Sequence, residues 1–403
     1  MKKRILFVDD EPNVLAGLQR MLRPLRGEWE VTFAQSGPEA LEKLAAAPFD
    51  VVVSDMRMPG MDGAALLAEV RQRYPGTVRI VLSGHSDKEM ILRSVGPAHQ
   101  YLAKPCDAET LKDTISRACA LRNLLADESL KQVIAQMPSL PSLPAVYAEL
   151  TRTLNSPDAS VQAVGRIIAS DVGMTAKILQ LVNSAFFGLR RHVSSPAEAA
   201  VLLGLETIKA LVLSVQVFSE FRAAQLEGFS LEALWKHSLA TGAGAKQLAA
   251  DEKSDGKLVD CALMAGLLHD AGKLVLAAHL GPRYGQTIAA ARERGLPLWQ
   301  AERETLGTTH AEVGAYLLGL WGLPDPIVEA IAFHHEPGRC LAQSFGTLTA
   351  IHVADFLDHE MRPEACQTVP SPVDVAYLSR IGAADRLNRW RETFRSAAER
   401  RGG

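Results

Sequence analysis

Five polar residues in the first part of the sequence could together accept and hold a phosphoryl group. They lie where short apolar runs end, and they are Asp9, Asp10, Asp55, Ser83 and Lys104. Carboxylates are natural ligands of Mg²⁺, and a carboxylate can also be the nucleophile that forms an aspartyl phosphate. A hydroxyl and an ammonium group can hold phosphoryl oxygens, since positioning and charge neutralisation carry most of phosphoryl transfer. The set therefore predicts a phosphoryl-acceptor site.

Buried parallel strands are the elements that must position these residues. The apolar runs at residues 4–8, 50–54, 79–82 and 100–103 are short, continuous and separated by helical patterns. Such runs are typical of parallel strands that are covered on both faces. Because ligands of these sheets gather at the carboxyl ends of the strands, all five polar groups are expected on one rim. One of them alone would more simply be a solvated loop residue, but five in this order favour a site.

The first 125 residues resemble the CheY-like receiver domain of a two-component response regulator, an α/β doubly wound parallel sheet of the flavodoxin-like kind. The segment from Asp55 to Gly63 is very similar to the phosphorylation loop of that family. The resemblance implies that a histidine kinase transfers a phosphoryl group to Asp55. It also implies that Asp10, Asp55 and the backbone carbonyl of Arg57 bind Mg²⁺, with Asp9 adjacent. Ser83 and Lys104 would then bind the phosphoryl group. By the same resemblance, Pro105 shapes the Lys104 loop and Tyr101 reports the phosphorylated state.

Composition and charge are those of an ordinary globular protein of two or three domains. Hydrophobic residues make up 47% and charged residues 22% of the 403 residues, and the formal net charge is −3. This charge gives no electrostatic case for nucleic-acid binding. Five cysteines without a CxxC pair fit a reducing cytosol, and no signal sequence or apolar stretch of about 18 residues is evident. We expect a cytoplasmic protein with neither a DNA nor a membrane partner.

A helical pattern continues from residue 107 to about residue 136, and three prolines then end it: Pro138, Pro141 and Pro144. We interpret residues 1–125 as the receiver, 126–138 as a helical connector and 139–403 as an all-α domain with an HD-like core at about 230–360. The apolar stripe of the connector has two interpretations. It pairs with a second copy as a short coiled coil, which would give a homodimer, or it packs on its own second domain.

Histidines and acidic residues of the helical domain recur on helix faces that are predicted to point inward. The series is His237, His269, Asp270, His310, His334, His335 and Asp355, with Lys273 one turn after Asp270. Imidazole and carboxylate groups that converge in a helical core are what a transition-metal site requires. A single histidine on such a face is more often a hydrogen-bonded core residue. The His269–Asp270–Lys273 group is a stronger signal, because a buried charge is costly without a partner. We interpret the remaining histidines as structural or surface residues: His85, His99, His192, His279, His352 and His359.

The helical part of the chain resembles two related families. Four segments are similar to the HDOD family, an output domain related to HD phosphohydrolases and generally regarded as non-catalytic: residues 140–144, 183–188, 202–205 and 235–238. The histidine and aspartate series instead matches the metal-ligand order of HD-type phosphodiesterases, which implies iron, manganese or zinc and a phosphate-binding role for Lys273. The branch that hydrolyses cyclic di-GMP would have a Gly-Tyr-Pro signature after His335, where this chain has Glu336–Cys340.

Two functions of different classes follow from these resemblances. The first is a response regulator in which phosphorylation of Asp55 controls an HDOD signalling or protein-interaction domain, with a histidine kinase as phosphodonor and an unidentified downstream partner. The second is a receiver-controlled, metal-dependent HD-type phosphohydrolase that acts on a nucleotide or cyclic dinucleotide. The HDOD segments favour the first function, and the intact ligand series keeps the second open.

Overall fold

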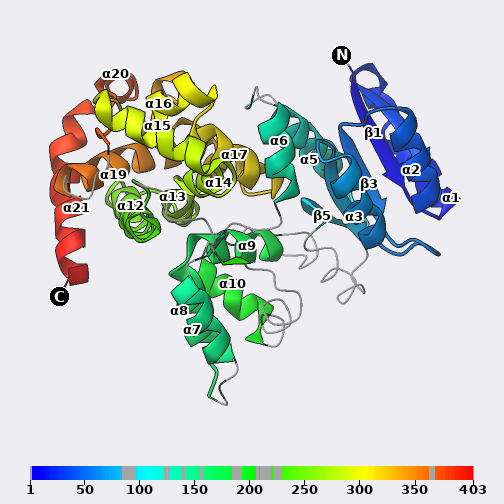
Figure 1. Cartoon of the computed structure of the whole chain (residues 1–403), viewed down its shortest axis with the longest axis horizontal. Helices are drawn as coiled ribbons and strands as arrows, with labels where there is room; N and C mark the ends of the chain where they lie inside the picture. The colour runs from blue at the N-terminus through cyan, green and yellow to red at the C-terminus, as the bar shows by residue number, and fades with distance from the viewer. Residues whose placement is uncertain are drawn as a thin grey trace.

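A computed structural model of the chain describes residues 2–83, 97–121, 125, 128–137, 141–142, 144–154, 156, 158–183, 193, 195–205, 208, 219–220, 228–362 and 368–402. In this part of the chain, an N-terminal α/β unit is followed by a helical unit (Figure 1). The predicted fold class, a doubly wound parallel sheet followed by an all-helical region, is confirmed.

The α/β unit is built on a five-stranded sheet with the order β2-β1-β3-β4-β5, in which all neighbouring strands are parallel. The strands are β1 (Lys3–Val8), β2 (Trp29–Ala34), β3 (Val51–Asp55), β4 (Val78–Ser83) and β5 (Gln100–Ala103). The four strands with apolar runs were predicted. Strand β2 was not, because it lies at the sheet edge and is partly exposed, so its sequence lacks a continuous apolar run.

Alternate residues of the central strands enter two different cores. Ile5 and Phe7 pack with the helices α1 (Pro12–Met21) and α5 (Ala108–Leu121), whereas Leu6 and Val8 pack with α2 (Gly37–Ala46) and α3 (Gly63–Arg73). This division follows from the two-residue period of a strand, whose successive side chains point to opposite faces. A short 3₁₀ helix, η1 (Arg23–Gly27), leads into β2. Both faces of the sheet are thus covered.

The helical unit contains two groups of helices (Figure 1). The first group consists of α7 (Pro144–Leu154), α8 (Val161–Ala169), α9 (Val172–Val182) and α10 (Pro196–Leu203), with a small parallel pair of β6 (Pro141–Ser142) and β7 (Ser219–Glu220). The second group consists of α12 (Leu231–Asp251), α13 (Gly256–Leu268), α14 (Ala271–Leu280), α15 (Pro282–Glu293), α16 (Leu298–Leu306), α17 (His310–Leu320), α18 (Asp325–Phe333), η4 (Pro337–Arg339), α19 (Thr347–Met361), α20 (Val375–Arg380), η6 (Ala384–Arg386) and α21 (Leu387–Gly402).

Small residues let the central helices of the second group approach closely. A methyl group added to Gly266 of α13 would lie 2.5 Å from the Cα atom of Gly242 on α12. A methyl group added to Gly272 of α14 would lie 1.9 Å from the backbone oxygen of His310 on α17. Because real side-chain atoms do not come so close to backbone, glycine is required at these crossings. The crossings hold α12, α13, α14 and α17 in one compact core.

The connector is the helix α6 (Glu128–Gln136), and it packs within its own chain. Its residues Leu130, Ile134 and Ala135 are buried, and the helix contacts α3 of the receiver and α17 of the helical unit. The backbone oxygen of Ala135 accepts hydrogen bonds from the side chains of Arg79 and His99. Of the two interpretations of the apolar stripe, the structure shows packing on the chain itself.

The stretch Gly256–Leu280 is long and apolar enough to span a membrane by length and composition, although the sequence analysis expected no such stretch. In the fold it comprises α13 and α14, which meet at His269 and Asp270. Of its most apolar window, 83% is buried inside the protein. Its apolar character is accounted for by its central position among the helices.

Candidate phosphoacceptor and metal sites

Three of the predicted phosphoacceptor residues meet at the carboxyl edge of the sheet. The Lys104 ammonium group donates hydrogen bonds to Asp9 Oδ2, at 2.6 Å, and to Asp55 Oδ1. The Arg57 backbone N–H donates to the other Asp55 oxygen at 2.6 Å, and the Glu11 N–H donates to Asp9 Oδ1 at 2.9 Å. Two buried carboxylates therefore share one lysine cation, an arrangement suited to a divalent cation and a phosphoryl group.

Burial and the Lys104 cation that the two carboxylates share determine the pKa shifts at this edge of the sheet. Burial raises the pKa of Asp55, and this effect exceeds the opposing effect of Lys104 and of the Arg57 N–H. Burial alone would lower the pKa of Lys104, but the hydrogen bonds that it donates to Asp55 and Asp9 raise it overall. Lys104 therefore remains a cation. It compensates two carboxylates that would otherwise repel each other in a partly desolvated site.

The other predicted receiver residues surround this centre. Asp10 is half-buried beside Asp9, and Arg57 is exposed on the loop after β3. Tyr101 is buried, in the same core as α2 and α3. Ser83 ends β4, and its side chain lies outside the described atoms. Pro105 follows Lys104 through a cis peptide bond.

Gly63 supports the phosphoacceptor loop, although the sequence analysis gave it no role of its own. It is the first residue of α3, and its N–H donates to the Met56 backbone oxygen at 3.0 Å. A methyl group added here would lie 2.1 Å from the backbone oxygen of Asp55. The preceding Asp62 caps the helix by accepting the Ala65 N–H at 2.8 Å. The missing side chain thus lets α3 begin directly against the acceptor residue.

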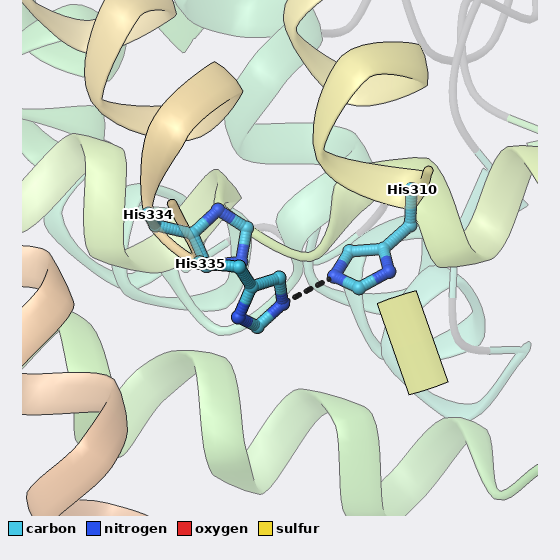
Figure 2. Close-up of side chains that lie close together, drawn as sticks. All are labelled: His310, His334 and His335. Atoms are coloured by element: carbon cyan, nitrogen blue, oxygen red, sulfur yellow. Dashed lines mark hydrogen bonds between the residues drawn. The ribbon is translucent and has the colours of Figure 1, made fainter. Parts of the chain in front are cut away.

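The seven predicted metal-ligating residues converge in the second helical group. They are His237 on α12, His269 and Asp270 between α13 and α14, His310 at the start of α17, His334 and His335 after α18, and Asp355 on α19. Figure 2 shows His310 facing His334 and His335 across the gap between two helix ends. The structure thus brings together residues that are far apart in the sequence.

Three groups of ligand atoms lie at this centre, and the third, His269, Asp270 and His334, links the other two. In the first, His237 Nε2 lies 3.1 Å from His269 Nε2 and 3.1 Å from Asp355 Oδ1. In the second, His310 Nε2 lies 2.9 Å from His335 Nε2, and His334 completes the group. Asp270 lies between them, with Oδ2 3.5 Å from His269 Nε2 and Oδ1 3.2 Å from His310 Nε2. One carboxylate could therefore bridge two cations.

The proton positions on the rings fit a metal centre. The Nδ1 atoms of His269 and His334 lie 2.7 Å from the backbone oxygens of Gly266 and Ile331, which can only accept. These neutral rings therefore turn Nε2 lone pairs toward the centre, where the buried His334 Nε2 makes no hydrogen bond with any described residue. Buried histidine nitrogens and carboxylate oxygens that face one another in this way are suited to a metal cation.

The pKa shifts divide the histidines into two kinds. Burial lowers the pKa of His334 to about 3 and holds that of His335 well below its usual value, so both are neutral and able to ligate. For His310, burial would lower the pKa, but the charge of Glu302 and the hydrogen bond to Asp270 raise it. The pKa of Asp270 lies well below its usual value, because His269 and Lys273 overcome the effect of burial.

Three further residues belong to this centre and were missed in the sequence analysis. Glu302, fully buried on α16, accepts hydrogen bonds from the backbone N–H and the Nδ1 of His310, each at 2.7 Å. Asp358 Oδ2 lies 2.7 Å from Nδ1 of His237, and the ring of His359 lies 4.4 Å from the His237 ring. Asp358 and His359 follow Asp355 by one helical turn, which was an available signal. For Glu302, by contrast, the spacing of residues in the sequence gave no signal that it contacts His310.

A cavity of about 400 Å³ opens above the centre. Ligand residues of both groups lie at its base, including His237, Asp270, His310 and His335. Cationic side chains line it as well (Lys236, Lys273, Arg362), and an apolar wall is formed by residues such as Phe229, Leu298 and Trp299. Lys273 Nζ binds Asp270 Oδ2 at 2.7 Å, so its cation is adjacent to the proposed ligands. The volume is in the range of small-molecule sites.

A parallel sheet with two acids and a lysine at its carboxyl edge defines a phosphoacceptor receiver domain, here joined to a helical output domain. The family model of the response regulator receiver domain matches residues 5–116, and that of the HDOD domain matches residues 140–337. The chain therefore belongs to the response regulators, with a receiver domain followed by an HDOD domain.

Relatives share one or both parts. An uncharacterized protein of Treponema pallidum (strain Nichols) is 27% identical over 294 residues, which cover 71% of this chain and 56% of that protein. The DNA-binding transcriptional regulator NtrC of Escherichia coli (strain K12) is 32% identical over 162 residues, 38% of this chain and 34% of NtrC. The chain thus spans about half or less of the length of these relatives.

Solved structures are also similar to this chain. The MmoQ response regulator from Methylococcus capsulatus str. Bath is 26% identical with a TM-score of 0.48, and the match covers 63% of this chain and 98% of that one. The receiver domain of an HD domain-containing protein from Pseudomonas fluorescens Pf-5 is 35% identical with a TM-score of 0.29. That match covers 30% of this chain and 90% of the other.

Proposed function

We propose that Asp55 is the phosphoacceptor through which a histidine kinase controls this response regulator. The Asp55 carboxylate attacks the phosphorus of a phosphohistidine, an O–P bond forms, the N–P bond breaks, and the imidazole leaves. Lys104 and Ser83 then hold the phosphoryl oxygens, while Asp10, Asp55 and the Arg57 carbonyl, with Asp9 adjacent, hold Mg²⁺. The observation that carries this proposal is the Lys104 cation shared by Asp9 and Asp55.

Labelling with radioactive acetyl phosphate tests this assignment. The variant Asp55→Ala should lose the label, because the nucleophile is gone. The variant Asp113→Asn changes an exposed carboxylate of α5 and should keep the label at the wild-type level. Label that persists in Asp55→Ala would refute the assignment of Asp55.

We further propose that the helical domain holds one or two transition-metal ions through the two ligand groups around Asp270. Iron, manganese or zinc bound there would polarise a phosphate ester and lower the pKa of a bound water. Lys236, Lys273 and Arg362 would attract the phosphate, and the apolar wall of the cavity would contact the remainder of the substrate. This arrangement favours, as a second function, hydrolysis of a nucleotide or cyclic dinucleotide. The orphaned Nε2 atom of His334 is the observation that supports it.

The two proposals for the output domain differ in what a metal does. If the domain only binds a downstream protein, phosphorylation changes its partner surface and no bound metal is needed. The deciding experiment is metal analysis by inductively coupled plasma mass spectrometry, on protein purified without chelator or metal-affinity resin. One or two equivalents of metal that a His269→Ala/Asp270→Ala variant loses would support hydrolysis and justify a phosphodiesterase screen. Little metal, unchanged in the variant and not recovered by reconstitution, would leave the interaction module.

The location and assembly of the protein belong to the same proposal. We place it in the cytoplasm, where a reducing environment suits its described cysteines, Cys106, Cys119, Cys261 and Cys340, which form no disulfide bond with one another. We do not extend the proposal to a homodimer through the connector, because the apolar residues of α6 are already buried within the chain.

A further inference from the structure

The helices α17 and α18 pack together as a hairpin that reaches from the receiver to the proposed metal centre. We call residues 310–335 the α17–α18 hairpin. Its turn, residues 321–324, lies at the receiver, and its open end carries His310, His334 and His335. A helix of 11 residues such as α17 is about 16 Å long, so the hairpin spans that distance as one packed element.

The receiver holds the turn end of the hairpin at both helices. Gln100, the first residue of β5, donates a buried hydrogen bond from Nε2 to the Gly319 backbone oxygen at 3.2 Å. Gly322 has a φ of +77°, and a methyl group added to it would lie 3.4 Å from Cδ of Gln100. Arg117 on α5 forms an ion pair of 3.0 Å with Asp325, the first residue of α18. The receiver thus contacts both the end of α17 and the start of α18.

Helix α9 completes the junction around the turn. The ammonium group of buried Lys177 lies 5.4 Å from the centre of the Trp321 ring. One turn further along α9, Gln180 donates to the His99 backbone oxygen of the receiver at 3.0 Å. The turn of the hairpin is therefore packed between the receiver and α9. A shift of the receiver edge cannot leave the turn unaffected, because close-packed interiors transmit displacement.

The open end of the hairpin supplies one complete ligand group. His310 is the first residue of α17, fixed by the Thr309 capping box, and His334 and His335 directly follow α18. Their ligand atoms lie within 4.8 Å of one another. The residues of the other group, His237, His269 and Asp355, come from outside the hairpin. The third group combines His334 of the hairpin with His269 and Asp270 outside it, so a movement of the hairpin displaces His334 relative to these two residues.

We propose that the receiver regulates the metal centre through the α17–α18 hairpin. Occupancy of Asp55 by a phosphoryl group changes the position of the β5 edge, the hairpin follows, and the metal affinity of the His310–His334–His335 group changes. This inference rests on the metal centre proposed above. Metal–ligand bonds tolerate little displacement. Coupling between two sites typically changes the affinity at each site by roughly five- to 150-fold. By linkage, metal bound at the hairpin changes the affinity of the receiver for the phosphoryl mimic by the same factor.

The test measures Zn²⁺ affinity by competition with a chromophoric chelator, in saturating Mg²⁺, with and without beryllofluoride as the phosphoryl mimic. Fluorine NMR confirms that beryllofluoride is bound to the full-length chain. We expect the dissociation constant for Zn²⁺ to change by about fivefold or more. A change of less than about twofold, with beryllofluoride bound, would overturn the proposal.

Two variants test the route of the coupling. Gln100→Ala and Arg117→Ala each remove one receiver contact to the hairpin, and each should reduce the effect of beryllofluoride on Zn²⁺ affinity. Lys112→Ala removes an exposed cation from the same helix as Arg117 and should keep the full effect. Full coupling in the combined Gln100→Ala/Arg117→Ala variant would exclude the hairpin contacts as the route.

A separate readout distinguishes failure of the coupling from failure of the metal centre. If His334→Ala binds Zn²⁺ as tightly as the wild type, the proposed ligand group is wrong. Hydrogen exchange of residues 310–335 without added zinc then decides whether the receiver still acts on the hairpin. Altered protection on adding beryllofluoride, absent in the Gln100→Ala variant, supports the coupling. Unaltered protection overturns it.

Discussion

The substitution Glu302→Gln tests most directly how the chain positions a metal ligand. Glu302 is fully buried, and its Oε2 accepts two hydrogen bonds from His310, one from the backbone N–H and one from Nδ1. Its Oε1 accepts a hydrogen bond from the Tyr284 hydroxyl at 2.8 Å. Glutamine has the same size but only one acceptor oxygen. If the NH₂ group faces His310, it meets two donors; if it faces Tyr284, the hydroxyl can accept from it, but the Tyr284 proton loses the carboxylate acceptor and a neutral oxygen holds His310 less strongly.

The structure sets the expected size of the effect. A buried donor left without an acceptor costs about 1–3 kcal/mol, so the free energy of unfolding should fall by roughly that amount. The change also releases the His310 ring from the orientation that turns Nε2 to the metal. Loss of such an outer partner typically weakens metal affinity by about 10- to 100-fold. The matched control is Tyr284→Phe, which removes one hydrogen bond from the same carboxylate and leaves His310 untouched. It should cost about 1 kcal/mol of stability and change metal affinity little.

Zn²⁺ competition titrations and urea unfolding of the metal-free chain measure the two effects separately. Glu302→Gln should lose both stability and affinity, whereas Tyr284→Phe should lose stability alone. Equal affinities for Glu302→Gln and the wild type would refute the positioning role of Glu302. Equal losses of affinity in both variants would show that general destabilisation, and not the orientation of His310, is responsible.

Three other substitutions test close contacts and a buried charge. Gly63→Ala places a methyl group 2.1 Å from the Asp55 backbone oxygen, so it should destabilise the receiver by about 1–3 kcal/mol and slow acetyl-phosphate labelling. Gly272→Ala places a methyl group 1.9 Å from the His310 backbone oxygen and should weaken Zn²⁺ binding about tenfold or more in competition titrations. Burial lowers the pKa of Lys177 from 10.5 to about 7, so the folded chain binds fewer protons than the unfolded chain between these pH values. Stability should therefore rise with pH in this window by up to about 1.4 kcal/mol per pH unit, and Lys177→Met should remove that rise in urea unfolding at pH 7.5 and 9.

Matched controls exist for the glycine substitutions. Gly17 of α1 and Gly256 of α13 are helical positions where an added methyl group meets nothing within 4 Å. Alanine at either position should leave labelling and Zn²⁺ affinity unchanged and should stabilise the chain by about 0.5–1 kcal/mol. If these controls lost function as strongly as Gly63→Ala and Gly272→Ala, the close contacts would not be the cause. A pH dependence in Lys177→Met equal to that of the wild type would assign the rise to other groups.

The receiver could be predicted well from the sequence because its chemistry coincides with its strand ends. Parallel strands that are covered on both faces must be continuously apolar, so the first polar residue after each run lies at the rim. Asp9, Asp55 and Lys104 meet there for this reason. Gly63 received no role because the need for glycine arises from the approach of α3 to a backbone oxygen, and a sequence pattern does not contain that distance.

The helical domain was predictable to a smaller degree. Helical periodicity indicated which histidines face inward, and the seven predicted ligands converge. Glu302 was not found, because its partnership with His310 depends on how α16 packs against α17. His359 was interpreted as structural or surface, yet it lies beside His237, since α19 presents two successive turns to the centre. The connector showed an apolar stripe in sequence, but only the packing shows that α3 and α17 cover it.

The receiver contacts the output domain at one end of its sheet and carries its acceptor residues at the opposite end. Gln100, at the amino end of β5, contacts the hairpin, whereas Lys104, directly after the carboxyl end, contacts Asp55. These two ends are about 13 Å apart along the strand. Among the described residues, the hairpin contact of Gln100 thus lies away from the acceptor edge that a kinase would approach. If the acceptor edge were covered, only the opened molecules would react, and the apparent rate would be the rate of the open form multiplied by the fraction that is open. In the described part of the chain, the contacts to the output domain and the residues proposed to receive the phosphoryl group therefore occupy different ends of the sheet.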